Sequence, residues 1–402
     1  MPQLLVFAER LFDGERAHTD AAVLVGEDGR IRWTGPRSRV PAEAKGAAET
    51  EAPRGTTLLP GLVNCHIHLT LAAGVDVDAE TRASDAELAL RAFANARRGL
   101  AAGVTTVRDL GAPTHAAIAL GRAVARGEVI GPNVVAAGRG IAPTGGHGWQ
   151  IGRQADGPDE VRKAVREQIY AGAGVIKIFS TGGLLGSGAH PDVAQLTAEE
   201  TRAAVEEAHS RKLRITTHAH AAAGARIAVE AGVDSVEHAT LLDAETIRLC
   251  RDKGVALVPT FSAVAAIVAN GDRLTPGIAD RARALSERHR QGIRDALVAG
   301  VVIAAGSDAG TAFNYAERFV TELEALVEIG MTAERAIAAA TSVAADVIAR
   351  EDVGRVRAGA RADLLAVRGD PLADVRACWD VAAVWKDGRA TGDLATPRLR
   401  PA

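Results

Sequence analysis

Histidines separated by one residue occur twice in the chain, as His66 and His68 in CHIH and as His218 and His220 in THAH. In a β-strand, residues i and i+2 point to the same face, so each pair can aim two imidazole rings at one site. Imidazole nitrogen is a common ligand of divalent metal ions such as Zn²⁺. The first pair follows an apolar run, and we expect both of its rings to bind one ion. Alternation alone does not choose between the rings of the second pair.

Lys177 lies between aliphatic residues in VIKIFS, although the chain has only six lysines. An unpaired buried ammonium is costly, so this side chain must be paired, neutral or modified. A neutral amine can react with carbon dioxide to give a carbamate, whose two oxygens can bridge two metal ions. The simpler interpretation is a lysine that is ion-paired in the core.

Asp308 ends the apolar run VIAAGSDAG, among small residues that leave room for a ligand. A carboxylate there can bind a metal ion and accept a proton from bound water, although an aspartate at this place can also cap the next helix. His238 in SVEHA and His147 in TGGHG also follow apolar runs. The remaining five histidines fall in expected loops or helices: His18, His115, His190, His209 and His289.

Short apolar strands that alternate with alanine-rich helical patterns must position these residues. Helical patterns include DAELALRAFANARRGLAAG and TAEETRAAVEEAHSRK, and the rhythm predicts a (β/α)8 TIM barrel, although doubly wound sheets share it. In such a barrel, the C-terminal ends of the strands converge on the active site. The expected strands are 59–68, 105–111, 133–140, 175–180, 214–220, 235–239, 256–261 and 302–310.

Strand-and-turn patterns occupy both ends of the chain, including a hairpin around GEDGR. We therefore expect three segments: residues 1–57 and 352–402 as the two parts of one small β-sandwich domain, and residues 58–351 as the barrel. The class is α/β.

The bulk composition excludes several partners. The 402 residues carry a formal net charge of −3, which argues against nucleic acid or an anionic membrane surface. No apolar run approaches the roughly 20 residues that span a bilayer, and no signal peptide is evident. The three scattered cysteines, Cys65, Cys250 and Cys378, favour reduced thiols, and we expect a cytoplasmic protein.

The order HxH, Lys, His, His and Asp on successive strands resembles the binuclear metal-dependent amidohydrolase superfamily. The details RDLG, TGGHG, KIFSTGG and GSDAG resemble its prolidase-like branch, which includes Xaa-Pro dipeptidases, N-acyl amino acid hydrolases and ochratoxinase relatives, with imidazolonepropionase as a neighbour. The resemblance spans nearly the whole chain. It implies a TIM barrel with a small sandwich domain and a homo-oligomeric assembly.

The resemblance also implies roles for the individual residues. Two divalent ions, with Zn²⁺ as the expected metal, would be joined by a carbamate on Lys177. His220 would be free for catalysis, and His147 would contact the substrate. One ion would be held by His66, His68 and Asp308, and the other by His218 and His238.

The implied reaction is hydrolysis of a C–N amide bond by a metal-bridging hydroxide, with Asp308 as base and then acid. Substrates would be small: Xaa-Pro-like dipeptides, N-acyl amino acids or ochratoxin-type amides. Backbone N–H groups of the loop 180–188 would bind a substrate carboxylate. Trp149 stands where relatives often have an acid, which suggests a more apolar substrate group.

Three alternatives remain on sequence grounds. The first is a mononuclear cyclic amidase, imidazolonepropionase-like enzyme or deaminase, which would not need the bridging Lys177. The second is a lactonase or phosphotriesterase-like activity, since the same ligands activate water toward esters. The third is an inactive metal-binding protein, against which the complete ligand set argues.

Overall fold

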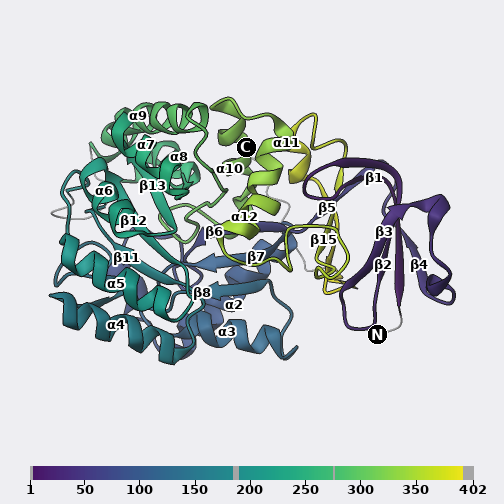
Figure 1. Ribbon diagram of the computed structural model, residues 1–402, viewed down its shortest axis with the longest axis horizontal. Helices are drawn as coiled ribbons and strands as arrows, with labels where there is room; N and C mark the ends of the chain where they lie inside the picture. The colour runs from purple at the N-terminus through teal and green to yellow at the C-terminus, as the bar shows by residue number, and fades with distance from the viewer. Residues whose placement is uncertain (1–2, 184–189, 275–276, 393–402) are drawn as a thin grey trace.

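The computed structural model describes residues 3–183, 190–274 and 277–392. A barrel and a smaller β domain lie side by side, the barrel to the left and the β domain to the right in Figure 1. The chain is α/β with a TIM-barrel fold and a β-sandwich domain from both chain ends, as predicted. Within the described residues, no helix combines the length and apolar character needed to cross a membrane.

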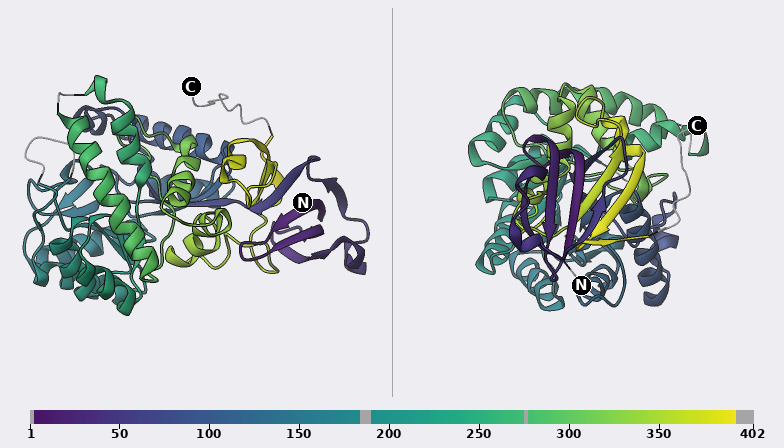
Figure 2. Two further views of the ribbon diagram at one scale, coloured as in Figure 1. Left: turned by 90° about the horizontal axis from the view of Figure 1, so that it is seen from above. Right: turned by 90° about the vertical axis from the view of Figure 1, so that its right-hand side faces the viewer.

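The β-sandwich domain joins the two ends of the chain in one sheet. Its central contact is β5, which pairs in parallel with β1 and antiparallel with β15, for example through Leu58 opposite Ala366. Figure 2 shows the N-terminal strands beside the C-terminal ones. The hairpin expected around GEDGR is formed by β2 and β3. The strands are β1 (Leu4–Phe12), β2 (Ala17–Val25), β3 (Ile31–Pro36), β4 (Ala48–Glu51), β5 (Thr56–Pro60), β15 (Leu364–Arg368), β16 (Val381–Lys386) and β17 (Arg389–Ala390).

The barrel strands run parallel in two groups, β6-β7-β8 and β10-β9-β11-β12-β13-β14. Most of their residues are buried, as expected for strands covered on one face by helices and filled on the other by side chains. The strands are β6 (Leu62–Ile67), β7 (Val104–Asp109), β8 (Asn133–Ala136), β9 (Gly140–Ala142), β10 (Gly152–Gln154), β11 (Ile176–Phe179), β12 (Ile215–Ala221), β13 (Ser235–Leu241) and β14 (Ala256–Val258).

The expected eighth strand, residues 302–310, is not a regular strand. It closes the barrel through isolated bridges, Ile303 to Leu257 on one side and Ala309 to Ile67 on the other. Asp308 interrupts the extended backbone with a left-handed conformation (φ 57°). The segment therefore keeps the place of a strand without a continuous ladder.

Helices cover the barrel between successive strands (Figure 1). Capping boxes begin two of them: Ser84 with Glu87 at α2, and Thr197 with Glu200 at α5. Both helices match the patterns expected from the sequence. The helices are α1 (Val77–Thr81), α2 (Asp85–Ala101), α3 (Ala116–Ala125), α4 (Pro158–Ala171), α5 (Ala198–Ser210), α6 (Ala222–Ala231), α7 (Ala244–Lys253), α8 (Phe261–Ala269), α9 (Ile278–Val298), α10 (Val320–Glu328), α11 (Ala333–Ala339) and α12 (Ser342–Val347).

Candidate active site

Six histidines meet at the C-terminal end of the barrel strands. They come from the ends of β6, β12 and β13 and from the loop after β9. Neighbouring rings in this cluster have centroids 4.4 Å to 5.3 Å apart, and its members are His66, His68, His147, His218, His220 and His238. The structure thus brings together both HxH pairs and the two single histidines that the sequence analysis selected.

Asp308 reaches this cluster from the segment that closes the barrel. Its Oδ1 lies 3.2 Å from Nε2 of His66 and 3.2 Å from Nε2 of His68. One ligand atom from each of these three residues falls within 4.8 Å of the others, a group that could hold a metal ion. Oδ1 of Asp308 is buried and has no hydrogen-bond partner among the described residues, so a cation there would satisfy an otherwise unpaired oxygen.

The two histidines of β6 are oriented by their other ring nitrogens. Nδ1 of His66 lies 2.9 Å from Oε2 of Glu237, and Nδ1 of His68 lies 2.9 Å from the carbonyl oxygen of Gly111. Carbonyl and carboxylate oxygens only accept hydrogen bonds, so both rings donate from Nδ1. Each neutral ring therefore presents the lone pair of Nε2 to the centre of the site, as a metal ligand must.

The electrostatics of this trio are dominated by burial and by Asp308. Burial lowers the pKa of His66 to about 4, so its ring is neutral at physiological pH. Burial acts the same way on His68, but the close contact with Asp308 outweighs it and raises its pKa. Burial opposes ionisation of Asp308, yet the two histidines hold its pKa below the ordinary value. The carboxylate is therefore ionised. A proton and a metal cation would compete for the space between Asp308 and the two histidines.

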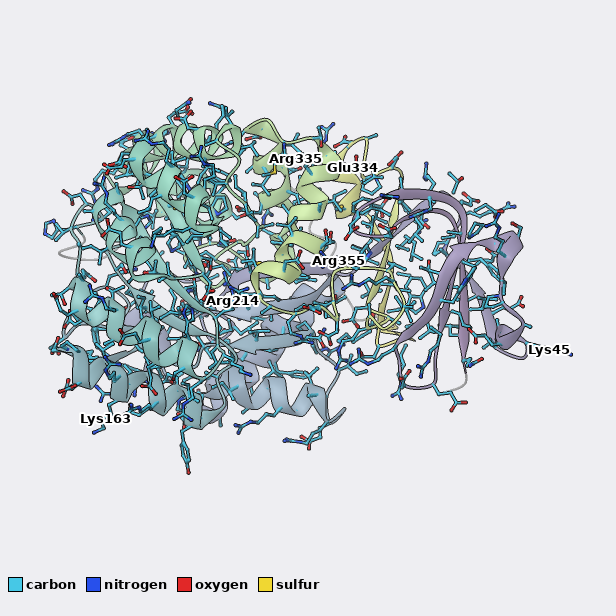
Figure 3. All side chains as sticks on the ribbon, viewed as in Figure 1. Lys45, Lys163, Arg214, Glu334, Arg335 and Arg355 are labelled. Atoms are coloured by element: carbon cyan, nitrogen blue, oxygen red, sulfur yellow. The ribbon has the colours of Figure 1, made fainter. Side chains whose placement is uncertain are left out.

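Lys177 is buried on β11 (1% exposed), and its Nζ has no hydrogen-bond partner within the described part of the chain. Lys45 and Lys163, in contrast, lie at the outer surface (Figure 3). Burial lowers the pKa of Lys177 to about 8, so a substantial fraction of the side chain is a neutral amine near physiological pH. Among the described residues no carboxylate pairs with Lys177, so the simpler interpretation from the sequence, a lysine that is ion-paired in the core, is not borne out.

Comparison with known proteins places this constellation in a family. Residues 57–391 match the amidohydrolase family. The chain belongs to the amidohydrolase family. It is 31% identical to ochratoxinase of Aspergillus niger, over 96% of this chain and 86% of that protein.

Two further relatives correspond to the prolidase-like branch and to its expected neighbour. A solved Xaa-Pro dipeptidase with methionine bound in its active site shares 32% identity with a TM-score of 0.87, over 96% of this chain and 99% of that one. Imidazolonepropionase of Anaeromyxobacter sp. (strain K) is 27% identical, over 87% of this chain and 86% of that protein. The predicted resemblance to the prolidase-like branch of the amidohydrolases is confirmed.

Positive backbone φ angles mark the strand ends of this amidohydrolase. His238 (φ 68°), Thr260 (φ 57°) and Asp308 (φ 57°) all adopt the left-handed conformation, which is unfavourable for residues other than glycine. Such strain clusters at functional sites, where the surrounding structure enforces it. It also lets Glu237 and His238, neighbours in sequence, both serve the site.

A buried charge network beneath the site was missed by the sequence analysis. Glu237 holds His66 with one carboxylate oxygen and accepts from Nη2 of Arg108 at 2.7 Å with the other. Both side chains are at most 1% exposed. Burial opposes the charge of Glu237, but Arg108 and His66 outweigh it and lower its pKa to about 2. The signal available in the sequence was a charged residue in each of two apolar strands, RDLG and SVEHA.

His147, His218 and His220 form the other side of the cluster. Nε2 of His218 faces the carbonyl oxygen of Gly182 at 3.3 Å, which leaves Nδ1 as its free nitrogen. His220 is oriented through Nδ1, 2.8 Å from Oγ1 of Thr240, and its Nε2 is free. The two histidines of THAH thus present different ring nitrogens.

Two loop predictions concern the rim of the site. Trp149 lies two residues after His147 and is 42% exposed, so it offers an apolar surface to solvent. The proposed carboxylate-binding loop 180–188 falls largely outside the described residues, which end at Gly183 and resume at His190. Gly183 itself packs closely, since a Cβ there would lie 2.2 Å from the His147 ring.

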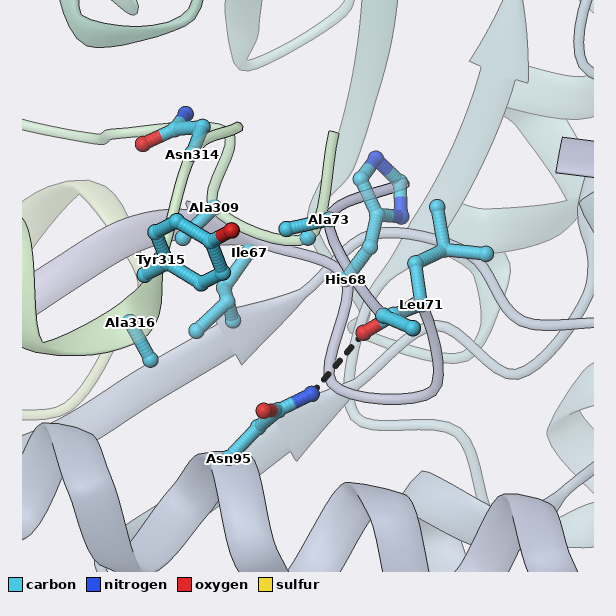
Figure 4. Close-up of a pocket in the computed structure, with 11 residues that line it drawn as sticks. Ile67, His68, Leu71, Ala73, Asn95, Ala309, Asn314, Tyr315 and Ala316 are labelled. Carbon is cyan, nitrogen blue, oxygen red and sulfur yellow. Dashed lines mark hydrogen bonds between the residues drawn. The ribbon is translucent and has the colours of Figure 1, made fainter. Parts of the chain in front are cut away.

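A small pocket is lined in part by His68 (Figure 4). Asn95 of α2 shapes it, donating from Nδ2 to the carbonyl oxygens of Leu69 at 2.9 Å and Leu71 at 2.8 Å. With a volume of about 10 Å³, the pocket has room for no more than one water molecule. It supports the loop after β6 and is too small for a substrate.

Proposed function

We propose that this amidohydrolase uses two divalent metal ions to hydrolyse a C–N amide bond in a small substrate. Two observations carry the proposal: His66, His68 and Asp308 bring three possible ligand atoms together, and Oδ1 of Asp308 and Nζ of Lys177 are buried without hydrogen-bond partners among the described residues. Without cations these polar atoms would be buried at a cost. Relatives named ochratoxinase and Xaa-Pro dipeptidase support amide chemistry.

The donor set fits two divalent ions, with Zn²⁺ suited to imidazole nitrogen and carboxylate oxygen. Lys177, as a carbamate, would supply the two oxygens that join the ions. When bound, the ions would acidify a water molecule and polarise the scissile carbonyl. One ion would be held by His66, His68 and Asp308, and the other by Nδ1 of His218 and Nε2 of His238.

Asp308 would move the proton. Its carboxylate is ionised in the folded protein, because His66 and His68 hold its pKa low against the effect of burial. It can therefore accept the proton that the attacking water releases and return it to the departing amine. The same carboxylate can serve in both steps.

The remaining histidines would contact the substrate. His147 and His220 both pack against His218 in the cluster, and each ring is neutral because burial lowers its pKa, to about 4 and about 3. A neutral ring can donate to the oxyanion that develops on the carbonyl oxygen. The exposed Trp149 favours an apolar group next to the amide, as in an Xaa-Pro-like dipeptide, an N-acyl amino acid or an ochratoxin-type amide.

A hydrolysis assay tests this function. The zinc-loaded protein is assayed against Xaa-Pro dipeptides, Xaa-Arg dipeptides and N-acyl amino acids, beside Asp308→Asn. We expect turnover of at least one class and a loss of roughly 100-fold or more in kcat for the variant. Retained turnover in Asp308→Asn would refute the proton-transfer role, and an inactive panel would argue against amide hydrolysis of this type.

A mononuclear activity on a cyclic amide is the second candidate. The three-residue group His66, His68 and Asp308 is complete by itself, and imidazolonepropionase is among the relatives. Lys177 distinguishes the candidates, since a mononuclear site has no use for a bridging group. An unchanged kcat in Lys177→Met would favour the mononuclear enzyme.

A further inference from the structure

The backbone at His238 is held in an unfavourable conformation by a residue far away in sequence. His238 and Ala239 are both left-handed, with φ 68° and 54°. The carbonyl oxygen of His238 lies 2.8 Å from Nε2 of His289 on α9. Because a carbonyl oxygen only accepts, His289 donates from Nε2. His289 is 1% exposed and 51 residues further along the chain, so it acts as a buried brace for this peptide.

The ring of His238 is oriented by a second residue, Thr260. Its Oγ1 lies 2.7 Å from Nδ1 of His238. Thr260 precedes α8 at the N-cap position, where a threonine hydroxyl normally accepts from a backbone N–H of the first turn. Here the Thr260 side chain makes no capping bond. Its hydroxyl instead forms the hydrogen bond with His238.

Glu322 of α10 supplies the missing cap. This carboxylate, 0% exposed, accepts from the backbone N–H groups of Phe261 at 3.0 Å and Ser262 at 2.8 Å, and from the Ser262 hydroxyl at 2.7 Å. The ring of His289 also packs on Phe261, with centroids 4.6 Å apart. Thr260 at the start of α8 and His289 of α9 therefore contact His238 directly, while α10 contacts the start of α8.

We propose that His289 and Thr260 are positioning residues for His238, with Glu322 capping α8 so that the Thr260 hydroxyl is free for this task. His289 fixes the left-handed backbone, and the hydrogen bond between the Thr260 hydroxyl and Nδ1 of His238 fixes the orientation of the ring, so that Nε2 is the nitrogen left for the site. The inference rests on the proposed function, in which His238 holds one metal ion. His289, which lies within helix α9, thereby gains a role in metal affinity.

The test compares matched variants in metal binding rather than in turnover. Zn²⁺ dissociation constants of the metal-free protein are measured by competition with a chromophoric chelator. His289→Leu removes the donor, whereas the side-chain amide of His289→Gln can replace it. We expect His289→Leu to raise the dissociation constant of one of the two ions by roughly 10- to 100-fold. His289→Gln should raise it by less than about threefold. His209→Leu, on the surface, serves as the control.

A second pair keeps the inference testable if His289→Leu fails to fold. Thr260→Val keeps the shape and loses the hydroxyl, and Thr260→Ser keeps the hydroxyl. Only the valine variant should lower the affinity for the ion at His238. Equal affinities in wild type and His289→Leu, or equal losses in both Thr260 variants, would overturn this inference alone. A wild-type protein that binds no second ion would overturn the proposed function and this inference with it.

Discussion

At the scale of single residues, the site depends on which ring nitrogen each histidine leaves free. Spacing alone predicted that both rings of an HxH pair share a face, because the strand period is two. The choice of nitrogen was not predictable, since the partners are distant in sequence: Glu237 for His66, Gly111 for His68 and Gly182 for His218. Long-range packing, rather than local pattern, sets the tautomers.

The two histidines of THAH should differ when each is removed. His218→Ala deletes a proposed metal ligand, and we expect the protein to lose one of the two proposed ions. His220→Ala deletes a residue proposed to contact the substrate, so both ions should stay while kcat falls roughly 100-fold or more. Metal content and kinetics of the two purified variants check this. Loss of an ion from His220→Ala, with both retained in His218→Ala, would reverse the assignment.

Glu237 should contribute to stability through Arg108. Glu237→Gln leaves the buried guanidinium without a counter-charge, and we expect a loss of about 3 kcal/mol in the free energy of unfolding. Denaturant unfolding of the metal-free protein measures it. Glu128→Gln, in an exposed pair with Arg126, is the matched control and should leave the unfolding midpoint unchanged. Similar effects of the two substitutions would contradict this account of the network.

At the scale of elements, the sequence was most informative where local chemistry decides. The capping residues Ser84 and Thr197 and the helical periodicity that follows them gave α2 and α5 nearly to the residue. The pattern of 302–310 predicted a strand, because it is apolar and short. The segment is irregular because Asp308 adopts a left-handed backbone and faces the histidines. This tertiary contact cannot be read from the local sequence pattern.

The cap on α8 makes a pH-dependent prediction. Burial raises the pKa of Glu322 from 4.5 to about 7, although its hydrogen bonds and Arg290 act in the opposite direction. Between these two values the folded protein keeps a proton that the unfolded chain releases, so stability falls as pH rises through this window.

Glu322→Gln cannot titrate, so the stability difference between wild type and variant should change across the same window. We expect wild type to lose on the order of 3 kcal/mol relative to the variant between pH 4.5 and pH 7. Urea unfolding of both proteins at several pH values measures this difference. Parallel pH profiles for the two proteins would show that the carboxyl group titrates normally.

At the scale of the whole molecule, strand-and-turn texture at both chain ends predicted one shared β domain, and β5 beside β15 confirms it. The packing between this domain and the barrel was not visible in the sequence. Gly103, between α2 and β7, has φ 90°, and a Cβ there would lie 2.7 Å from Leu365 of β15. A glycine in the barrel thus allows close approach of a strand from the other domain.

Gly103→Ala should therefore cost more than a positive φ alone explains. Gly127→Ala is the matched control, because Gly127 has φ 71° and no described atom lies within 4 Å of the place that its methyl group would take. We expect the control to cost about 1 kcal/mol and Gly103→Ala roughly 1–2 kcal/mol more. Thermal unfolding of both variants measures the difference. Equal costs would mean that Leu365 moves aside freely.

The count of metal ions per chain tests the central claim most directly. The metal-free protein is reconstituted with excess Zn²⁺ in bicarbonate buffer, freed of unbound metal and analysed by mass spectrometry for elements, beside Lys177→Met. The account predicts about two ions per wild-type chain and fewer in the variant, because the bridging group is lost. One ion per chain in both proteins would contradict the binuclear site.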